Sequence, residues 1–121
     1  MNYATESVIE SKVMEGVRFR IAKMSFGRRI ELARQIRELA QRIEFLNAGD
    51  SGAEKMDAAL LWSEIDRVYV LWGLKAVEGL ELDGCPATPE QLAAAGPEEL
   101  FREVLTQIKM QCGLTAAERK N

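Results

Sequence analysis

Hydrophobic residues recur at helical spacing through the first half of the chain. From Arg28 to Asn47 the apolar side chains fall three or four residues apart, which places them on one narrow stripe of an amphipathic helix. Asn47-Ala48-Gly49 then ends the pattern, because glycine supplies the backbone freedom that a helix end requires. We therefore predict a helix over 28–47 with one packed face and one wet face. The stripe consists of Leu32, Ile36, Leu39, Ile43 and Leu46.

A capping pattern predicts where the next helix begins. Ser51-Gly52-Ala53-Glu54 matches a capping box, in which the serine and glutamate side chains satisfy the exposed amides of the first turn. The following apolar run continues to about Glu78 and is apolar on more than one side, which is typical of a central helix covered by several neighbours. We expect Trp62, Tyr69 and Trp72 to supply much of its buried area.

Glycine and proline divide the remainder of the chain. Gly73, within the second predicted helix, favours a close helix contact or a bend. Residues 79–87 are predicted to form a loop with a tight reversal at Asp83-Gly84. Thr88-Pro89-Glu90-Gln91 is a second capping signature and opens a short helix that ends at Gly96. A last amphipathic helix is predicted from Pro97 to Gly113.

The N-terminal part has a different periodicity. Val17 to Ile21 alternates apolar and charged residues, which predicts a short strand with one apolar and one basic face. Val8 to Met14 is a candidate partner strand, which would make a hairpin. A lone strand or hairpin of this kind leaves a backbone edge, such as one at 17–21, that must be covered or paired, so it could dock on the helices or on another chain.

These elements predict a mainly α fold. We expect a small helical domain of three main helices plus a short helix, with a short N-terminal β-strand or hairpin. With 121 residues, 47% of them hydrophobic and 29% charged, the chain is the right size for one globular domain over 1–121. Its expected parts are a strand or hairpin region at 1–27, a helical core at 28–113 and a polar C-terminal end at 114–121.

The charge is unevenly distributed. The chain carries a net charge of -3, yet Val17 to Arg42 holds eight basic residues against two glutamates, a local charge of +6. These arginines could be the solvated face of a helix, phosphate contacts on nucleic acid, or contacts to a protein such as the acidic part of a neighbouring copy. We favour protein contacts over nucleic acid, because the chain has no recognised nucleic-acid-binding motif and a pI of about 5.1. The candidate partner contacts are Arg18, Arg20, Arg28, Arg29, Arg34, Arg37 and Arg42.

The residue types present argue against most catalytic and metal chemistry. The chain contains no histidine, and its two cysteines cannot make a four-cysteine zinc site. We expect Cys85 and Cys112 to remain thiols and to behave as small core residues in the cytoplasm. The sequence has neither a glycine-rich phosphate loop nor an N-terminal signal pattern, and no stretch has the roughly 20 apolar residues of a membrane span. We predict no enzyme activity, no cofactor and no metal.

The order of these motifs resembles the tail assembly chaperones of long-tailed phages and prophages. The resemblance covers nearly the whole chain, most clearly from Trp72 to Asn121, and its motifs are strands, caps and turns. They are Gly16-Val17-Arg18-Phe19-Arg20-Ile21, Ser25-Phe26-Gly27-Arg28-Arg29, Trp72-Gly73-Leu74, the run from Val77 to Gly84, Pro86-Ala87-Thr88, Gly96-Pro97-Glu98-Glu99-Leu100 and the polar end from Gly113 to Asn121.

The resemblance implies a non-enzymatic protein of the host cell cytoplasm. Such chaperones coat the long helical tape measure protein, keep its apolar stripe from aggregating and help to recruit the tail tube protein. The opposite charges of the two parts of this chain also favour a homo-oligomer. Two other functions remain open: a small nucleic-acid-binding regulator that uses the basic helix, and a structural tail completion or connector protein.

Overall fold

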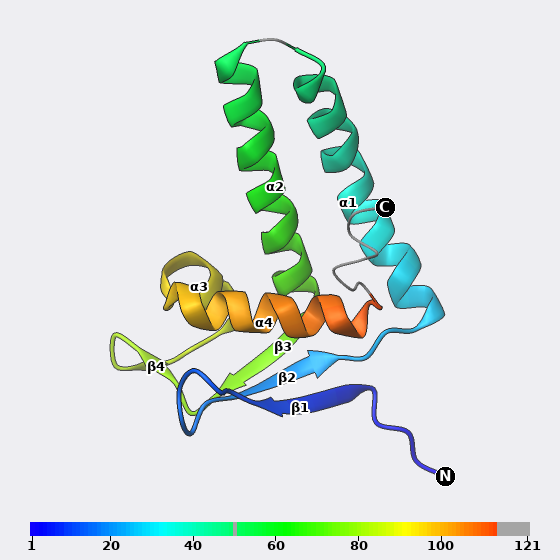
Figure 1. Ribbon diagram of the computed structural model, residues 1–121. Coiled ribbons are helices and arrows are strands. Elements are labelled where there is room, and N and C mark those ends of the chain that lie inside the picture. Colours follow the sequence, from blue (N-terminus) through cyan, green and yellow to red (C-terminus); the bar gives the residue numbers. More distant parts are fainter. Residues whose placement is uncertain (50, 114–121) are drawn as a thin grey trace. The chain divides into compact units, whose positions relative to one another are not determined.

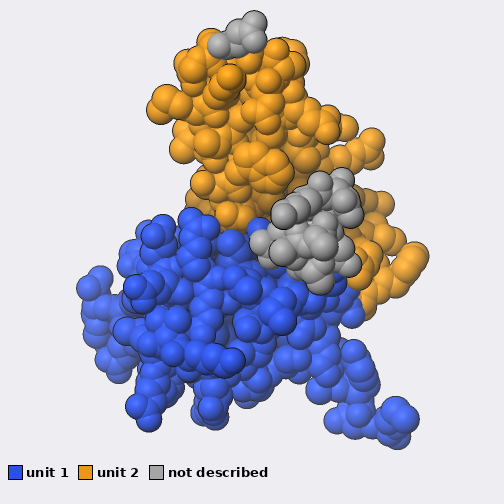
Figure 2. Space-filling view, in the orientation of Figure 1, with its two compact units in different colours: residues 1–24, 70–121 blue, residues 25–69 orange. Residues whose placement is uncertain are grey.

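The computed structural model describes residues 1–49 and 51–113, in which the chain divides into two compact units. Unit 1 consists of residues 1–24 and 70–121, and unit 2 of residues 25–69 (Figure 2). The expectation of a single domain over 1–121 stays a prediction. The predicted C-terminal end at 114–121 lies outside the described residues.

Unit 1 is built on a three-stranded antiparallel sheet. Strand β1 (Glu6–Glu10) pairs with β2 (Arg18–Ala22), and β2 pairs on its other side with β3 (Leu74–Glu78) (Figure 1). Helices α3 (Pro89–Ala95) and α4 (Glu98–Gln111) accompany the sheet, and α4 packs against β2. The prediction of helices with a short hairpin is confirmed, but the sheet is larger than predicted.

The hydrophobic core of unit 1 contains buried side chains of the middle strand β2 and of helices α3 and α4. On β2, Phe19 and Ile21 are fully buried, while Arg18 and Arg20 face outward, as the alternation predicts. Gly73 is also in this interior, where a methyl group in place of its hydrogen would lie 2.8 Å from Ile108 Cγ2. The close contact predicted at Gly73 is therefore confirmed. Among the residues that the structure describes, the largest fully buried side chains are Phe19, Ile21, Val70, Leu92, Leu100, Val104 and Ile108.

Three expectations for unit 1 are wrong. The strand predicted at Val8 to Met14 is β1 at Glu6–Glu10, because Ser11 Oγ accepts hydrogen bonds from the amides of Val13 and Met14 and turns the chain there. The predicted edge at 17–21 is absent, since β2 is paired on both sides. Cys112 is buried as expected, but Cys85 is exposed.

The long second helix is also shorter than predicted. Helix α2 (Gly52–Gly73) ends at Gly73, and the residues expected to continue it to Glu78 form β3 instead. The segment 74–78 is bracketed by Gly73 and Gly79 and supplies the second partner for β2, so tertiary pairing outweighs the helical periodicity. Gly79 has a φ of +81°, and a side chain there would meet the carbonyl of Gly16.

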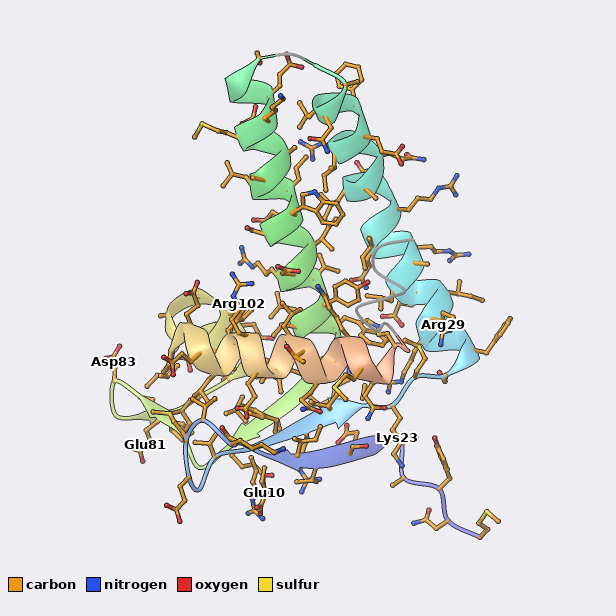
Figure 3. The ribbon with its side chains drawn as sticks, viewed as in Figure 1. Glu10, Lys23, Arg29, Glu81, Asp83 and Arg102 are labelled. Carbon is orange, nitrogen blue, oxygen red and sulfur yellow. The ribbon has the colours of Figure 1, made fainter. Side chains whose placement is uncertain are left out.

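The local signals downstream are confirmed. Residues of the predicted loop form a small hairpin of β4 (Glu81–Leu82) and β5 (Cys85–Pro86), with Asp83 at its turn (Figure 3). Asp83 and Gly84 both have positive φ, as a two-residue hairpin turn requires. Thr88 caps α3 through a reciprocal capping box with Gln91.

Unit 2 is a hairpin of two helices. Helix α1 (Phe26–Asn47) begins two residues earlier than predicted, because Ser25 Oγ accepts a hydrogen bond from the amide of Arg28. After α1, the side chain of Ser51 caps the next helix: its Oγ accepts a hydrogen bond from the Glu54 amide at 3.0 Å. This starts α2, which belongs to unit 2 up to Tyr69.

No helix within 1–49 and 51–113 combines the length and the apolar character needed to cross a membrane.

Candidate protein-binding groove

The two helices of unit 2 meet along a narrow apolar seam. Ile43 of α1 and Ala58 and Ile65 of α2 are buried there. Around them pack the partly buried residues Ile36, Leu39, Leu46, Leu61 and Tyr69, four of which belong to the predicted stripe or the predicted core. The periodicity of 28–47 therefore identified the packed face of α1 correctly.

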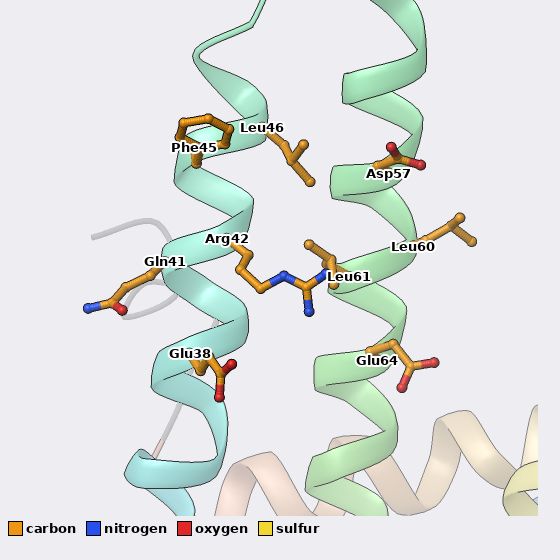
Figure 4. A pocket seen from close by; sticks show the side chains of 9 residues that line it. All are labelled: Glu38, Gln41, Arg42, Phe45, Leu46, Asp57, Leu60, Leu61 and Glu64. Atoms are coloured by element: carbon orange, nitrogen blue, oxygen red, sulfur yellow. The ribbon is translucent and has the colours of Figure 1, made fainter.

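A groove of about 640 Å³ runs beside this seam, and all of its lining residues belong to unit 2. Leu46 and Leu61 extend from the seam into the groove, and Phe45 and Leu60 provide further apolar surface (Figure 4). Arg42 reaches from α1 toward α2 across the middle of the groove. The remaining lining residues are Glu38, Gln41, Asp57 and Glu64.

Large apolar side chains around this groove are left in water. Phe45 is 76% exposed and Leu60 66% exposed, although both line the groove. Met56 and Trp62, also on α2, are exposed as well, although neither lines the groove. Exposed apolar side chains that line one groove, as Phe45 and Leu60 do, are typical of a surface that another protein covers.

The prediction for Trp62 is wrong. It was expected in the core with Tyr69 and Trp72, but it is 55% exposed, whereas Trp72 is buried and Tyr69 partly buried. Within unit 2, α2 buries only the side that bears Ala58 and Ile65, so its other apolar residues remain in water. The sequence signal for the exposed surface was therefore present, since α2 is apolar on more than one side.

The seven candidate arginines do not form one patch. Arg18 and Arg20 lie on β2 in unit 1, and the other five lie on α1 in unit 2. Arg20 Nε is 3.4 Å from Glu78 Oε1, and Arg18 stands opposite Glu10 and Glu78 in the strand register. These two arginines thus belong to a cross-strand row of opposite charges.

The arginines of α1 point in several directions. Arg28 and Arg29 are adjacent in sequence, so their side chains leave the helix at different angles. Arg34, Glu38 and Arg42 follow each other at intervals of four, which makes a row of alternating charge along one face. Arg42 is the one predicted contact that lines the groove. Arg37 lies outside the groove lining, as do Arg28, Arg29 and Arg34.

Comparison with known proteins gives no relative to guide this assignment. No family model, no curated protein and no solved structure matches the chain.

Proposed function

We propose that this chain is a non-enzymatic tail assembly chaperone of a long-tailed phage or prophage, which binds the tape measure protein and assists assembly of the tail tube. The observation that carries the proposal is the groove of unit 2, where Phe45 and Leu60 remain largely exposed. The arrangement of sequence motifs, which resembles that family, supplies the identity of the client. Client retention is a binding equilibrium and requires no catalytic group.

The groove suits a holdase in its size and polarity. A helical client buries its apolar stripe against Phe45, Leu46, Leu60 and Leu61, and covering such surface contributes about 25 cal/mol per Å² before the costs of association. The charged, solvent-exposed side chains at the rim of the groove limit the free energy gained by covering its apolar surface. A chaperone must release its client to the tail tube protein, and a shallow groove of modest affinity permits release.

The unequal charge distribution supports self-association. Five arginines of the basic segment from Val17 to Arg42 lie on α1 within a chain of net charge -3, so these arginines of one copy attract carboxylates of another. We propose a homo-oligomer formed in this way in the host cytoplasm. Size-exclusion chromatography with light scattering should show an oligomer that dissociates as the salt concentration rises, whereas a monomer under all conditions would contradict it.

Co-expression tests the chaperone function directly. The chain is produced together with the long helical protein encoded just downstream, and the client is then measured in the soluble, co-purified fraction. We expect the wild-type chain to retain and solubilise this client. A client that stays insoluble while the chain elutes alone would contradict the proposal.

Two matched double variants make this experiment specific. Phe45→Ser with Leu60→Ser removes exposed apolar surface from the groove, and Val8→Ser with Val13→Ser removes exposed apolar surface from unit 1. We expect the first variant to lose most of the co-purified client and the second to retain it. Equal losses would show that the groove is not the binding surface.

The two other functions predict different results. Phosphate contacts weaken steeply as salt rises, so a nucleic-acid-binding regulator would bind DNA or RNA in a strongly salt-dependent manner. A structural tail protein would be found by mass spectrometry in purified particles, where a chaperone is absent. The row Arg34, Glu38 and Arg42 disfavours the nucleic-acid function, because a carboxylate between two arginines repels the phosphate backbone.

A further inference from the structure

The rim of the groove carries a distinct charge. Glu38 lies on the α1 side, and Asp57 and Glu64 lie on the α2 side. Against these three carboxylates, Arg42 is the single basic residue among the nine that line the groove. The α2 wall of the groove is thus acidic, whereas Glu38 and Arg42 balance each other on the α1 wall.

The carboxylates are spaced along the groove as well as across it. Asp57 and Glu64 are seven residues apart on α2, which is two helical turns or roughly 10 Å of rise. Glu38 and Glu64 lie toward one end of the groove, while Phe45 and Asp57 lie toward the other (Figure 4). A rod-shaped ligand lying along the groove would therefore meet two acidic groups on the side that faces α2.

A helix is the ligand that fits such a surface. The groove is walled by side chains of two helices, so it presents no strand edge to which an extended peptide could add. An amphipathic helix places apolar residues at i, i+3, i+4 and i+7 into an apolar groove, and its flanking residues then face the rim. Lysine or arginine on the flank that faces α2 would pair with Asp57 and Glu64, whereas glutamate or aspartate there would be repelled.

We propose that the groove of unit 2 binds an amphipathic helix that carries lysine or arginine on the flank of its apolar stripe that faces Asp57 and Glu64 of α2. The inference rests on the proposed function only in taking the groove as the client-binding surface, and it adds the chemistry of the client segment. Arg42 meets the apolar stripe with its alkyl chain, since long basic side chains cover apolar surface while their charged ends stay in water.

Two synthetic helical peptides test the charge preference. Both carry the same leucine stripe, one flanked by lysines and the other by glutamates at the same positions. Fluorescence anisotropy with the full chain should show that the lysine peptide binds about tenfold more tightly, equivalent to ~1.4 kcal/mol. Equal binding of the two peptides, or tighter binding of the glutamate peptide, would overturn the proposal.

Charge reversal in the chain locates the effect. Asp57→Lys with Glu64→Lys should reverse the preference, so that the glutamate peptide binds more tightly. The matched control is Glu81→Lys with Glu98→Lys, which changes the net charge equally at exposed carboxylates of unit 1. The control should keep the preference for the lysine peptide. The same reversal in both variants would assign the effect to net charge and overturn the proposal.

The remaining outcomes separate this inference from the proposed function. If neither peptide binds but the downstream client is still retained, the inference fails and the chaperone function stands. If the lysine peptide binds with the expected preference and the client is not retained, the chaperone function fails and the inference stands. If Leu60→Ser turns an oligomer into a monomer, the groove is occupied by a second copy, which would also overturn the inference.

Discussion

The two units of this chain differ in how completely they bury their large apolar residues. In unit 1, Phe19 of β2 is fully buried, and among residues 1–49 and 51–113 the seven largest fully buried side chains all belong to this unit. In unit 2, Phe45 of α1 is 76% exposed and Leu60 of α2 is also exposed. The same kinds of residue therefore stabilise unit 1 and remain exposed on unit 2.

The difference follows from the elements available in each unit. A sheet with helices packed on it encloses side chains from several directions, so β2 can bury Phe19 and Ile21 completely. Within a two-helix hairpin, each helix covers only one side of its partner. Apolar residues on the other sides of α2, such as Leu60 and Trp62, need a further partner to become buried.

The largest expected effect is a loss of stability in unit 1. Phe19→Ala removes a fully buried ring and should lower the free energy of unfolding by about 4 kcal/mol. The matched substitution in unit 2, Phe45→Ala, should lower it by less than about 0.5 kcal/mol, because the ring is already in water. Urea unfolding of both variants measures the difference. Similar losses would break the comparison between the units.

A second prediction concerns the tight backbone of unit 1. Gly79→Ala should lower the free energy of unfolding by about 3 kcal/mol. A methyl group there would clash with the Gly16 carbonyl, and this clash adds to the strain of an alanine at positive φ. Gly84 has a similar φ, but a methyl group there would point into open space, so Gly84→Ala should lower the free energy of unfolding by only about 1 kcal/mol. Thermal unfolding of the pair separates the clash from the strain. Equal costs would show that the approach to Gly16 is unimportant.

The seam of unit 2 should be less sensitive than the core of unit 1. Ile65→Ala should lower the free energy of unfolding by about 2 kcal/mol, at the low end for a buried isoleucine, since many of its neighbours are only partly buried. Hydrogen exchange of the α1 and α2 amides would report the loss in this unit. A loss as large as that of Phe19→Ala would show that the seam is packed as tightly as unit 1.

A smaller effect than that at Ile65 is predicted at a polar contact of unit 1. Glu103 of α4 accepts hydrogen bonds from Ser11 Oγ at 2.6 Å and from the Lys12 amide at 2.7 Å. Glu103→Ala should lower the free energy of unfolding by about 1 kcal/mol and speed exchange of the Lys12 amide. The double variant with Ser11→Ala should cost less than the sum of the single variants. Additive costs would show that the two side chains act independently.

Local signals in the sequence predicted much of this fold. The stripe of 28–47 identified the packed face of α1, and Thr88-Pro89-Glu90-Gln91 identified the cap of α3. Asp83-Gly84 identified the hairpin turn. These features depend on interactions within a few residues, so a single sequence contains the information needed to find them.

Features that depend on distant segments were harder to predict. Residues 74–78 form a strand because β2 needs a second partner, and a run of apolar residues after a helix does not reveal that pairing. Trp62 was expected in a core, because hydrophobic periodicity does not tell how many neighbours cover a helix. The groove was missed for the same reason, while the arginine cluster in the sequence proved to be spread over two units.

The central claim is that the groove of unit 2 is the surface that contacts the client. Site-specific photo-crosslinking measures this most directly, with a photoreactive side chain placed at position 60 in the groove or at position 8 on β1, both exposed apolar sites. In cells that co-express the client, we predict a crosslink to the client from position 60 and none from position 8. A crosslink from position 8 alone would contradict the account.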